Sequence, residues 1–398
     1  MSEQRELKYI DLFAGAGGLS LGLHNAGFKG LFAVEKNDDA FATLKFNLID
    51  KEKHFDWPEW LPKTTHDICE LVDKYKIELE SLRDKVDLIV GGPPCQGFSS
   101  AGQRDHQDVR NTMVHYYLEV IRLVRPKYIM LENVRGFTMR FKEDSSKVPY
   151  SDIVVKKLKD MNYSVETEEI RMSDYTVPQS RVRFILIGSL NDDISDFFQK
   201  LKSNVKNFAK EKGIPETNNV KDAIADLLKS NGSIKCDDCN QNFQSGVYGE
   251  SISKYQSLMR NTDLKNPNSH RFAKHTLDIE ELHKRLIKDG PVGKRITPKD
   301  KTLEGLRRRS VTLLDPNESS PTITSNPDGL VHYCEPRILS VREFARLQSF
   351  PDYYEFKGKY TTGGKLRRTD VPRYTQVANA VPPLFAEQIG TVFKEIIK

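Results

Sequence analysis

The sequence lacks the features that would place it in a membrane or outside the cell. No apolar run approaches the roughly 18 residues that a transmembrane helix needs. The polar N-terminus, MSEQRELKYIDLF, lacks the apolar stretch of a signal peptide. The five cysteines do not form the pattern of a disulfide framework. We therefore expect an intracellular globular protein whose cysteines stay reduced.

The chain as a whole also lacks a large excess of either charge, since its net charge is only +5. Residues 191–310 hold 23 Lys and Arg against 17 Asp and Glu, so the rest of the chain is close to neutral. Within 284–309 the count is ten basic residues to three acidic ones. Such a local excess suits a polyanionic partner, although a solvated surface explains it equally well.

Strands and helices are expected to alternate through the first half of the chain. Strands are expected over 8–14, 30–35, 86–94, 127–134 and 181–190. Helices are expected over 15–27, 38–48, 111–126 and 151–163. This alternation predicts an α/β fold with a doubly wound, mostly parallel sheet.

The pattern changes after residue 190, because 191–330 is polar and only weakly periodic. We interpret this region as an inserted smaller domain. Helical spacing resumes over 340–350, where Ser340 and Glu343 form a capping box, and over 384–397. The expected division is 1–190 with 371–398 as one domain, and 191–370 as the other with its hinge.

A glycine-rich segment, DLFAGAGGLSLG (11–22), joins the first strand to the first helix. Its glycines let a ligand approach the backbone, and free N–H groups at a helix start accept anions. Glu35 ends the next strand, where a carboxylate can hold ribose hydroxyls. A tight structural turn or a nicotinamide nucleotide site would explain the same pattern.

The stretch GGPPCQGFS (91–99) is more specific, because it sets Cys95 directly after a strand. Pro93 and Pro94 fix the backbone that aims the thiol, and reactive cysteines occupy such special settings. The alternative is a small buried cysteine.

Two further strands carry charged residues at their ends. Glu132 in ENV ends a strand at the same edge of the sheet, unless it is a surface or capping glutamate. In QSRVR, a period of two predicts Gln179, Arg181 and Arg183 on one face of a strand. Arginines in a cleft need anions, although an edge strand can also carry them.

These motifs together resemble the DNA (cytosine-5)-methyltransferases that use S-adenosylmethionine. The resemblance rests on the order of DLFAGAGGLSLG, Glu35, HDI (66–68), GGPPCQGFS, ENV, QSRVR, RILSVREFARLQSFPD (337–352) and QVANAVPP (376–383). The matching parts are about 1–190 and 330–398. Residues 191–330 fall where that family carries its variable target-recognition region, so the resemblance implies a Rossmann-like catalytic domain and an inserted target-recognition domain.

The resemblance implies roles for individual residues. Cys95 would attack C6 of a flipped-out cytosine, Glu132 would act at N3, and Arg181 and Arg183 would steady the base. The cofactor S-adenosylmethionine would contact Phe13, Ala14, Gly15, Gly17, Gly18, Leu19, Glu35, Asp67, Ile68, Pro94 and Asn379. Duplex DNA would contact Gln96, Ser99, Arg110, Lys294, Arg295, Arg307, Arg308 and Arg309.

The resemblance also implies a monomer of the bacterial cytoplasm or nucleoid, with a cognate restriction endonuclease encoded separately. No metal is expected, because Cys236 and Cys239 lie about 30 residues from His270 and His275, too far for a zinc finger. Two positions depart from the family: Ala378 stands where glycine is common, and Lys36 follows Glu35 where some members have an aromatic residue.

Three alternatives stay open from the sequence. A tRNA cytosine methyltransferase shares the motifs, but the long basic region favours duplex DNA. A DNA-binding regulator without catalysis would not need the set of Cys95, Glu132 and Arg183. A nicotinamide oxidoreductase would explain the glycine turn but has no use for Pro-Pro-Cys beside ENV.

Overall fold

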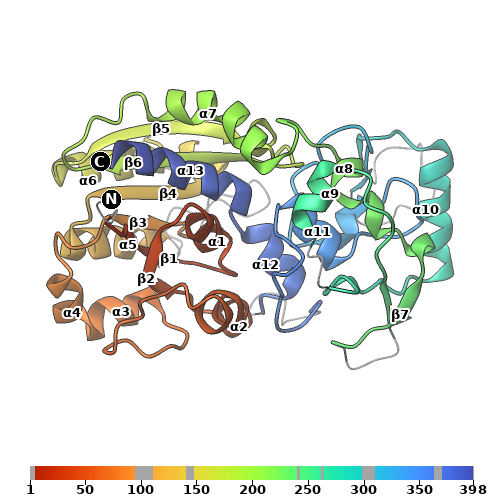
Figure 1. Ribbon diagram of the computed structural model, residues 1–398, viewed down its shortest axis with the longest axis horizontal. Helices are drawn as coiled ribbons and strands as arrows, with labels where there is room; N and C mark the ends of the chain where they lie inside the picture. Colours follow the sequence, from red (N-terminus) through yellow and green to blue (C-terminus); the bar gives the residue numbers. More distant parts are fainter. Residues whose placement is uncertain are drawn as a thin grey trace. The chain divides into compact units, whose positions relative to one another are not determined.

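The chain folds into two compact units, whose elements Figure 1 shows. The structure is a computed structural model that describes residues 5–94, 111–139, 148–239, 243–260, 264–297, 310–362 and 370–397. The first unit consists of Met1–Arg171, Val182–Asn204 and Phe385–Lys398. The second consists of Met172–Arg181 and Val205–Leu384.

These bounds differ from the predicted domain division. The second unit begins its long segment at Val205 and ends at Leu384, whereas the predicted ends are 191 and 370. It also includes Met172–Arg181. Helix α7 (Phe197–Lys212) runs through the boundary at 204, so the change of composition after 190 does not coincide with it. The assignment of catalysis to one unit and target recognition to the other stays a prediction.

The first unit is built on a six-stranded sheet. Its strands are β1 (Lys8–Leu12), β2 (Lys29–Val34), β3 (Leu88–Gly91), β4 (Tyr128–Val134), β5 (Ser164–Arg171) and β6 (Val182–Ser189). Their order is β2-β1-β3-β4-β6-β5, with β1 to β4 parallel and β6 antiparallel to both β4 and β5. The predicted mostly parallel, doubly wound sheet is confirmed. The strand order reverses between β1 and β3, which makes a topological switch point where ligands bind in such sheets.

Helices cover both faces of this sheet (Figure 1). They are α1 (Gly18–Asn25), α2 (Asp38–Leu44), η1 (Lys45–Lys51), α3 (Ile68–Lys74), α4 (Lys76–Ser81), α5 (Asn111–Val124), η2 (Arg135–Thr138), α6 (Tyr150–Asp160), α7 and α13 (Pro383–Ile396). One apolar cluster joins α3, α4, α5 and α6 to strand residues such as Ile89 and Ile129. Tyr128 points to the opposite face, since side chains alternate along a strand. There its ring lies 5.6 Å from the ring of Phe393 in α13.

Several elements of this unit are not predicted from the sequence. Helices α3 and α4 follow the HDI motif, and β5 is an edge strand. The sequence of β5, SVETEEIR, is rich in glutamate, and only Ile170 of its residues is fully buried. An exposed edge strand lacks the apolar alternation on which strand prediction depends.

The second unit contains short helices and small sheets. Its helices are η3 (Met172–Tyr175), α8 (Val220–Ile224), η4 (Ala225–Leu227), η5 (Lys229–Asn231), α9 (Lys254–Met259), α10 (Leu277–Asp289), η6 (Pro327–Gly329), α11 (Val341–Leu347) and α12 (Arg373–Asn379). Its strands are β7 (Ser233–Lys235), β8 (Gln244–Gly246), β9 (Arg295–Ile296), β10 (Val311–Leu313) and β11 (Leu330–Val331). Across the described ranges of both units, no helix combines the length and the apolar character that crossing a bilayer requires.

Helix α11 lies in the core of the second unit, since every one of its residues is buried. The predicted capping box of Ser340 and Glu343 is confirmed at its start. Glu343 also pairs with Arg337 at 2.7 Å, and Arg346 pairs with Asp352 at 2.6 Å. Buried charges require such partners because burial removes their water. The charges of this segment therefore serve the packing of the unit.

Candidate active site

A glycine-rich turn follows β1 and leads into α1. Phe13, Gly15 and Gly17 have φ values of 62°, 56° and 85°, all in the left-handed region. This conformation is unfavourable for an aromatic residue such as Phe13, and backbone strain of this kind clusters at binding sites. A Cβ added to Gly15 would meet nothing within 4 Å. The turn therefore leaves open space beside its backbone, where a ligand can approach.

Glu35 follows β2, and backbone N–H groups hold its carboxylate. Gly15 N donates to Oε2 at 2.9 Å, and Asn37 N donates to Oε1 at 2.7 Å. Burial raises the pKa of Glu35 above its usual range, although these hydrogen bonds act in the opposite direction. Each carboxylate oxygen has a second lone pair. The carboxylate is thus oriented and can still accept a hydrogen bond from a ligand hydroxyl.

The HDI motif lies beside Glu35, whose carbonyl accepts from His66 N at 2.9 Å. Asp67 caps α3 by accepting from Cys69 N at 2.9 Å, and it accepts from Lys36 Nζ at 2.6 Å. Burial acts to raise the pKa of Asp67, but these two donors outweigh it and hold the pKa below its usual range. Lys36, which departs from the family pattern, therefore serves as the partner of Asp67.

Asp11 in β1 is a notable residue that the motif analysis does not single out. It is 1% exposed, and the Ser20 hydroxyl donates to its Oδ2 at 2.6 Å. Burial raises the pKa of Asp11 to about 7; the Ser20 hydrogen bond opposes this and the charge of Glu35 adds to it. Strongly perturbed carboxyl groups often mark functional sites. The available signal in the sequence is an aspartate inside the apolar strand YIDLF.

Glu132 and Arg183 meet where β4 and β6 pair. Glu132 Oε1 lies 2.9 Å from Arg183 Nε, and the side chains are 10% and 12% exposed. Burial lowers the pKa of Arg183, and the charge of Glu132 opposes this effect. Neither of these two atoms completes a hydrogen bond with any residue that the structure describes. The pair is thus held mainly by charge, and burial strengthens the attraction between the two groups.

The Gly-Gly-Pro-Pro segment leaves β3 next to Glu132. A Cβ added to Gly92 would lie 3.2 Å from Glu132 Oε2, so the glycine leaves room for the carboxylate. Asn133 Nδ2 donates to Pro93 O at 3.3 Å. The segment that leads to Cys95 is therefore tied to β4 at the residue next to Glu132.

Gln179 and Arg181 belong to the second unit. Strand β6 begins at Val182, so the prediction that Gln179, Arg181 and Arg183 share one face of a single strand is wrong. The physical reason is that the backbone at Gln179 pairs with Ser320 of the second unit. Arg183 pairs with Glu132, whereas Arg181 Nη1 donates to Ala378 O at 2.8 Å.

The remaining predicted residues lie in several places. Ala14, Gly18, Leu19 and Ile68 are buried in the glycine turn and at the starts of α1 and α3. Pro94 is exposed in the first unit, and Asn379, Lys294 and Arg295 are exposed in the second. Outside the described residues lie Cys95, Gln96, Ser99, Arg110, Arg307, Arg308 and Arg309.

The CDDC segment has the chemistry of a packed loop. The Cys236 thiol donates to Asp238 Oδ1 at 3.2 Å, and burial raises the pKa of Cys236 to about 12. A metal-binding cysteine must ionise instead. Over the ranges that the structure describes, no three His, Cys, Asp or Glu side chains gather as metal ligands.

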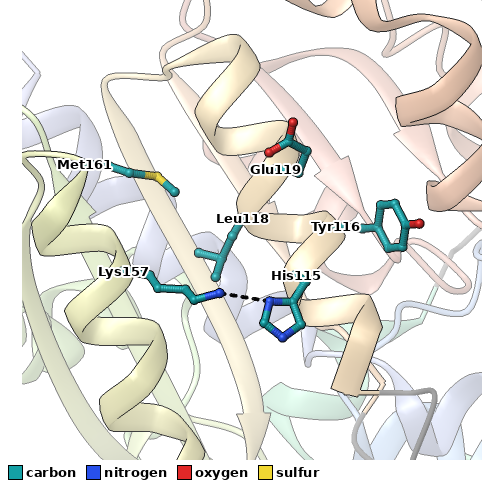
Figure 2. Close-up of a pocket in the computed structure, with 6 residues that line it drawn as sticks. All are labelled: His115, Tyr116, Leu118, Glu119, Lys157 and Met161. Carbon is teal, nitrogen blue, oxygen red and sulfur yellow. Dashed lines mark hydrogen bonds between the residues drawn. The ribbon is translucent and has the colours of Figure 1, made fainter.

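A cavity of about 470 Å³ lies elsewhere in the first unit, between α5 and α6 (Figure 2). Its lining residues are His115, Tyr116, Leu118, Glu119, Lys157 and Met161. Lys157 Nζ donates to His115 Nδ1 at 3.0 Å, and burial together with this ammonium lowers the pKa of His115. None of the predicted site residues lines this cavity, so it is separate from the candidate active site.

The doubly wound sheet, with its glycine turn at the switch point, has the architecture of a Rossmann-like methyltransferase. Solved structures share this fold. A prophage-encoded protein of E. coli, described as a DNA modification methyltransferase, has a TM-score of 0.68 at 24% identity and covers 98% of this chain and 99% of its own. The Dnmt2 methyltransferase of S. pombe has a TM-score of 0.55 at 17% identity and covers 99% and 100%.

Sequence relatives identify the family. The model of the C-5 cytosine-specific DNA methylases matches residues 7–395. The type II methyltransferase M.DdeI of Desulfomicrobium norvegicum is 30% identical over 402 residues, which cover 96% of this chain and 88% of the relative. The type II methyltransferase M.PspPI of a Psychrobacter species is 33% identical over 392 residues, which cover 97% and 78%.

The chain therefore belongs to the C-5 cytosine-specific DNA methylase family. It is a DNA (cytosine-5)-methyltransferase of the restriction–modification type, which transfers a methyl group to C5 of cytosine in DNA. The family and the activity that the ordered motifs imply are both confirmed.

Proposed function

We propose that the methyl donor is S-adenosylmethionine and that it binds at the glycine turn. The open space beside Gly15 supports this, because a ligand can contact the backbone there. Glu35 supports it further, since its fixed carboxylate can accept hydrogen bonds from two neighbouring ribose hydroxyls. The bound donor supplies an electrophilic methyl group on a sulfonium.

The proposed reaction begins with the thiolate of Cys95. Cytosine C5 is a weak nucleophile, so the sulfur attacks C6, and the electron pair of the C5–C6 double bond moves onto the ring. Glu132 hydrogen-bonds or protonates N3, which stabilises this pair. C5 then takes the methyl group. A base removes the C5 proton, the double bond re-forms, and the bond from sulfur to C6 breaks to release the thiolate. Any proton placed on N3 returns to Glu132.

The observation that carries this proposal is the pair of Glu132 and Arg183 beside the segment that leads to Cys95. Glu132 is close to Gly92, and Asn133 holds Pro93. The acid at N3 and the nucleophile at C6 must act on the same flat ring. These two contacts support a position of Cys95 near Glu132, because they join the segment before Cys95 to β4. Arg183, whose guanidinium pairs with Glu132, would steady the base beside it.

The proposed substrate is a cytosine within a specific sequence of duplex DNA. Its C6 is unreachable in the stacked helix, so the base must be flipped out. The second unit would select the sequence, with Lys294 and Arg295 on phosphates. We further propose that the protein acts as a monomer and protects DNA from a separately encoded endonuclease.

Covalent trapping on 5-fluorocytosine tests the proposal. Mixed-sequence duplex DNA containing this base is incubated with the protein and S-adenosylmethionine, then run on a denaturing gel. Fluorine cannot leave C5 as a proton does, so the wild-type protein should stay attached through Cys95. The Cys95→Ala variant, which is the matched control, should give no covalent band. A band of equal strength in both proteins would overturn the role of Cys95, and methylation of tRNA alone would overturn the DNA substrate.

A further inference from the structure

Three cations and two aromatic rings of the second unit form a stacked cluster. Arg271 Cζ lies 4.2 Å from the ring centroid of Phe243 and 4.0 Å from that of Tyr360. Lys274 Nζ lies 4.9 Å from the Phe243 centroid, and Arg373 Cζ lies 4.2 Å from the Tyr360 centroid. The face of an aromatic ring attracts a cation. Cations and rings therefore alternate, with Arg271 in the middle of the cluster.

Backbone pairing beside β8 brings Arg271 and Phe243 to the same face. Arg271 and Ser245 of β8 form an antiparallel bridge. Next to this bridge, Phe272 N donates to Gln244 O at 2.9 Å. Residues two apart along an extended chain share a face, so Phe243, two residues before Ser245, lies diagonally across from Arg271. The local fold thus sets the guanidinium over this ring.

Arg271 differs from other stacked arginines of this unit because it has no carboxylate partner. Four arginines there both stack on a ring and pair with a carboxylate: Arg260, Arg337, Arg342 and Arg373. Arg271 is half-buried, makes no ion pair with any described residue, and has a buried Nε without a hydrogen-bond partner among them. A partly desolvated guanidinium without a partner gains from an anion supplied by a ligand.

The carboxylate of Asp238 lies at one end of the cluster, but other groups occupy it. It accepts hydrogen bonds from Arg373 Nη1 and from the Tyr360 hydroxyl, the latter at 2.7 Å. These contacts fix the ring of Tyr360, on which Arg271 stacks. One carboxylate faces three cations, so the cluster keeps an excess of positive charge.

We propose that Arg271 binds a phosphate group of the DNA backbone, and that the rings of Phe243 and Tyr360 hold its guanidinium for this contact. The N–H donors of a guanidinium lie in its plane, so rings over its faces leave its edge for phosphate oxygens. DNA, the substrate of this family, supplies the phosphates. The inference rests on the proposed function in taking duplex DNA as the bound form. Phosphate contacts carry no sequence information, so Arg271 serves affinity for duplexes of any sequence.

Binding of the full-length protein to labelled mixed-sequence duplexes, measured by fluorescence anisotropy at several salt concentrations, tests the proposal. Arg271→Met removes the charge but keeps an apolar chain against the rings. It should weaken binding about tenfold at low salt, the equivalent of one lost charge-assisted hydrogen bond. It should also reduce the slope of log affinity against log salt by about 0.9. Arg271→Lys keeps the charge and should therefore keep the slope.

Arg260→Met is the matched control for a stacked arginine that has partners. Arg260 lies over the ring of Tyr248, pairs with Asp226 and donates to Gly249 O at 2.9 Å, so its loss should leave the salt slope unchanged. Thermal unfolding reports on folding, and Arg271→Gln is a second neutral variant if Arg271→Met is unstable. An unchanged slope in the folded neutral variant, or an equal loss of slope in Arg260→Met, would overturn the inference. Absence of duplex binding by the wild-type protein would instead overturn the proposed function.

Discussion

Asp11 and Glu35 of the first unit are buried in the opposite way to Glu343 of the second unit. In the first unit, burial raises the pKa of Asp11 to about 7 and also raises the pKa of Glu35. Their hydrogen-bond donors are neutral, a serine hydroxyl and backbone N–H groups. In the second unit, burial likewise acts to raise the pKa of Glu343, but Arg337 outweighs it through two hydrogen bonds of 2.7 Å. The pKa of Glu343 falls to about 2.

This difference separates carboxylates that serve a site from those that serve the fold. A fully paired carboxylate has no capacity left for a ligand, and removing its partner exposes the cost of a buried charge. A carboxylate whose pKa burial has raised destabilises the folded protein when it is ionised, and groups with strongly perturbed pKa values gather where chemistry occurs. Glu132 combines the two cases, since it is nearly buried and pairs with the charged Arg183, but this contact is an ion pair without a completed hydrogen bond.

The largest effect is expected from Glu132→Gln in the first unit. An amide cannot give up a proton, so kcat should fall by about 10² to 10⁴-fold while cofactor affinity is retained. The rate at which labelled methyl groups are transferred to saturating DNA measures kcat. Glu119→Gln, at a half-buried glutamate that pairs with Arg122, is the matched control and should keep full activity. Turnover of Glu132→Gln within tenfold of wild type would remove Glu132 from the chemistry.

The same substitution in the second unit, Glu343→Gln, should act on stability instead. It removes the charge that Arg337 faces at 6% side-chain exposure, which we expect to cost about 3 kcal/mol of unfolding free energy. The effect is at the low end for a broken buried pair because Glu335 still pairs with Arg337 at 2.7 Å. Urea unfolding measures it. If Glu343→Gln lowered the unfolding free energy by less than Glu132→Gln does, the distinction between a carboxylate for the fold and one for the site would be contradicted.

The sequence predicts the sheet well because its strands are buried and bounded by glycine and proline. The family motifs likewise predict that Glu132 and the glycine turn lie at strand ends. Both features are local, so a pattern of a few residues is sufficient to locate them.

Other features depend on contacts between distant segments, and no local pattern reveals them. Arg181 and Arg183 are two residues apart, yet one faces a carbonyl 197 residues away and the other a carboxylate of β4. No sequence motif points to Asp11 either, because burial in the folded chain is what raises its pKa. Tertiary packing decides each of these cases.

The pH dependence of stability should have opposite signs for Asp11 and Glu343. The folded protein keeps a proton on Asp11 between about pH 4 and pH 7, where the unfolded chain has lost it. Asp11 therefore lowers stability as pH rises through this window, by at most about 1.4 kcal/mol per pH unit. Glu343, with its lowered pKa, adds stability above about pH 4.5 that is lost as pH falls toward 2.

Urea unfolding of Asp11→Asn at pH 5, 6 and 7 isolates the first of these effects. The asparagine keeps an acceptor for Ser20 but cannot titrate, so the variant should gain stability relative to wild type as pH rises. Asp50→Asn, an exposed aspartate paired with Lys45, should follow wild type at each pH. Parallel pH profiles for wild type and Asp11→Asn would show that the Asp11 carboxyl is not perturbed.

The smallest effect should come from removing exposed positive charge in the second unit. These side chains are neither buried nor paired as Glu343 is, so we expect their loss to change DNA binding and not stability. Lys294 and Arg295 are exposed, so they are available to phosphates and not needed for packing. Lys294→Ala and Arg295→Ala should each weaken binding to all duplex sequences alike and reduce the slope of log affinity against log salt by about 0.9. Lys74→Ala, on α3 of the first unit and paired with Glu70, is the control. A change in the preferred sequence at unchanged salt slope would mean that these residues contact base edges, and that the second unit reads DNA through them.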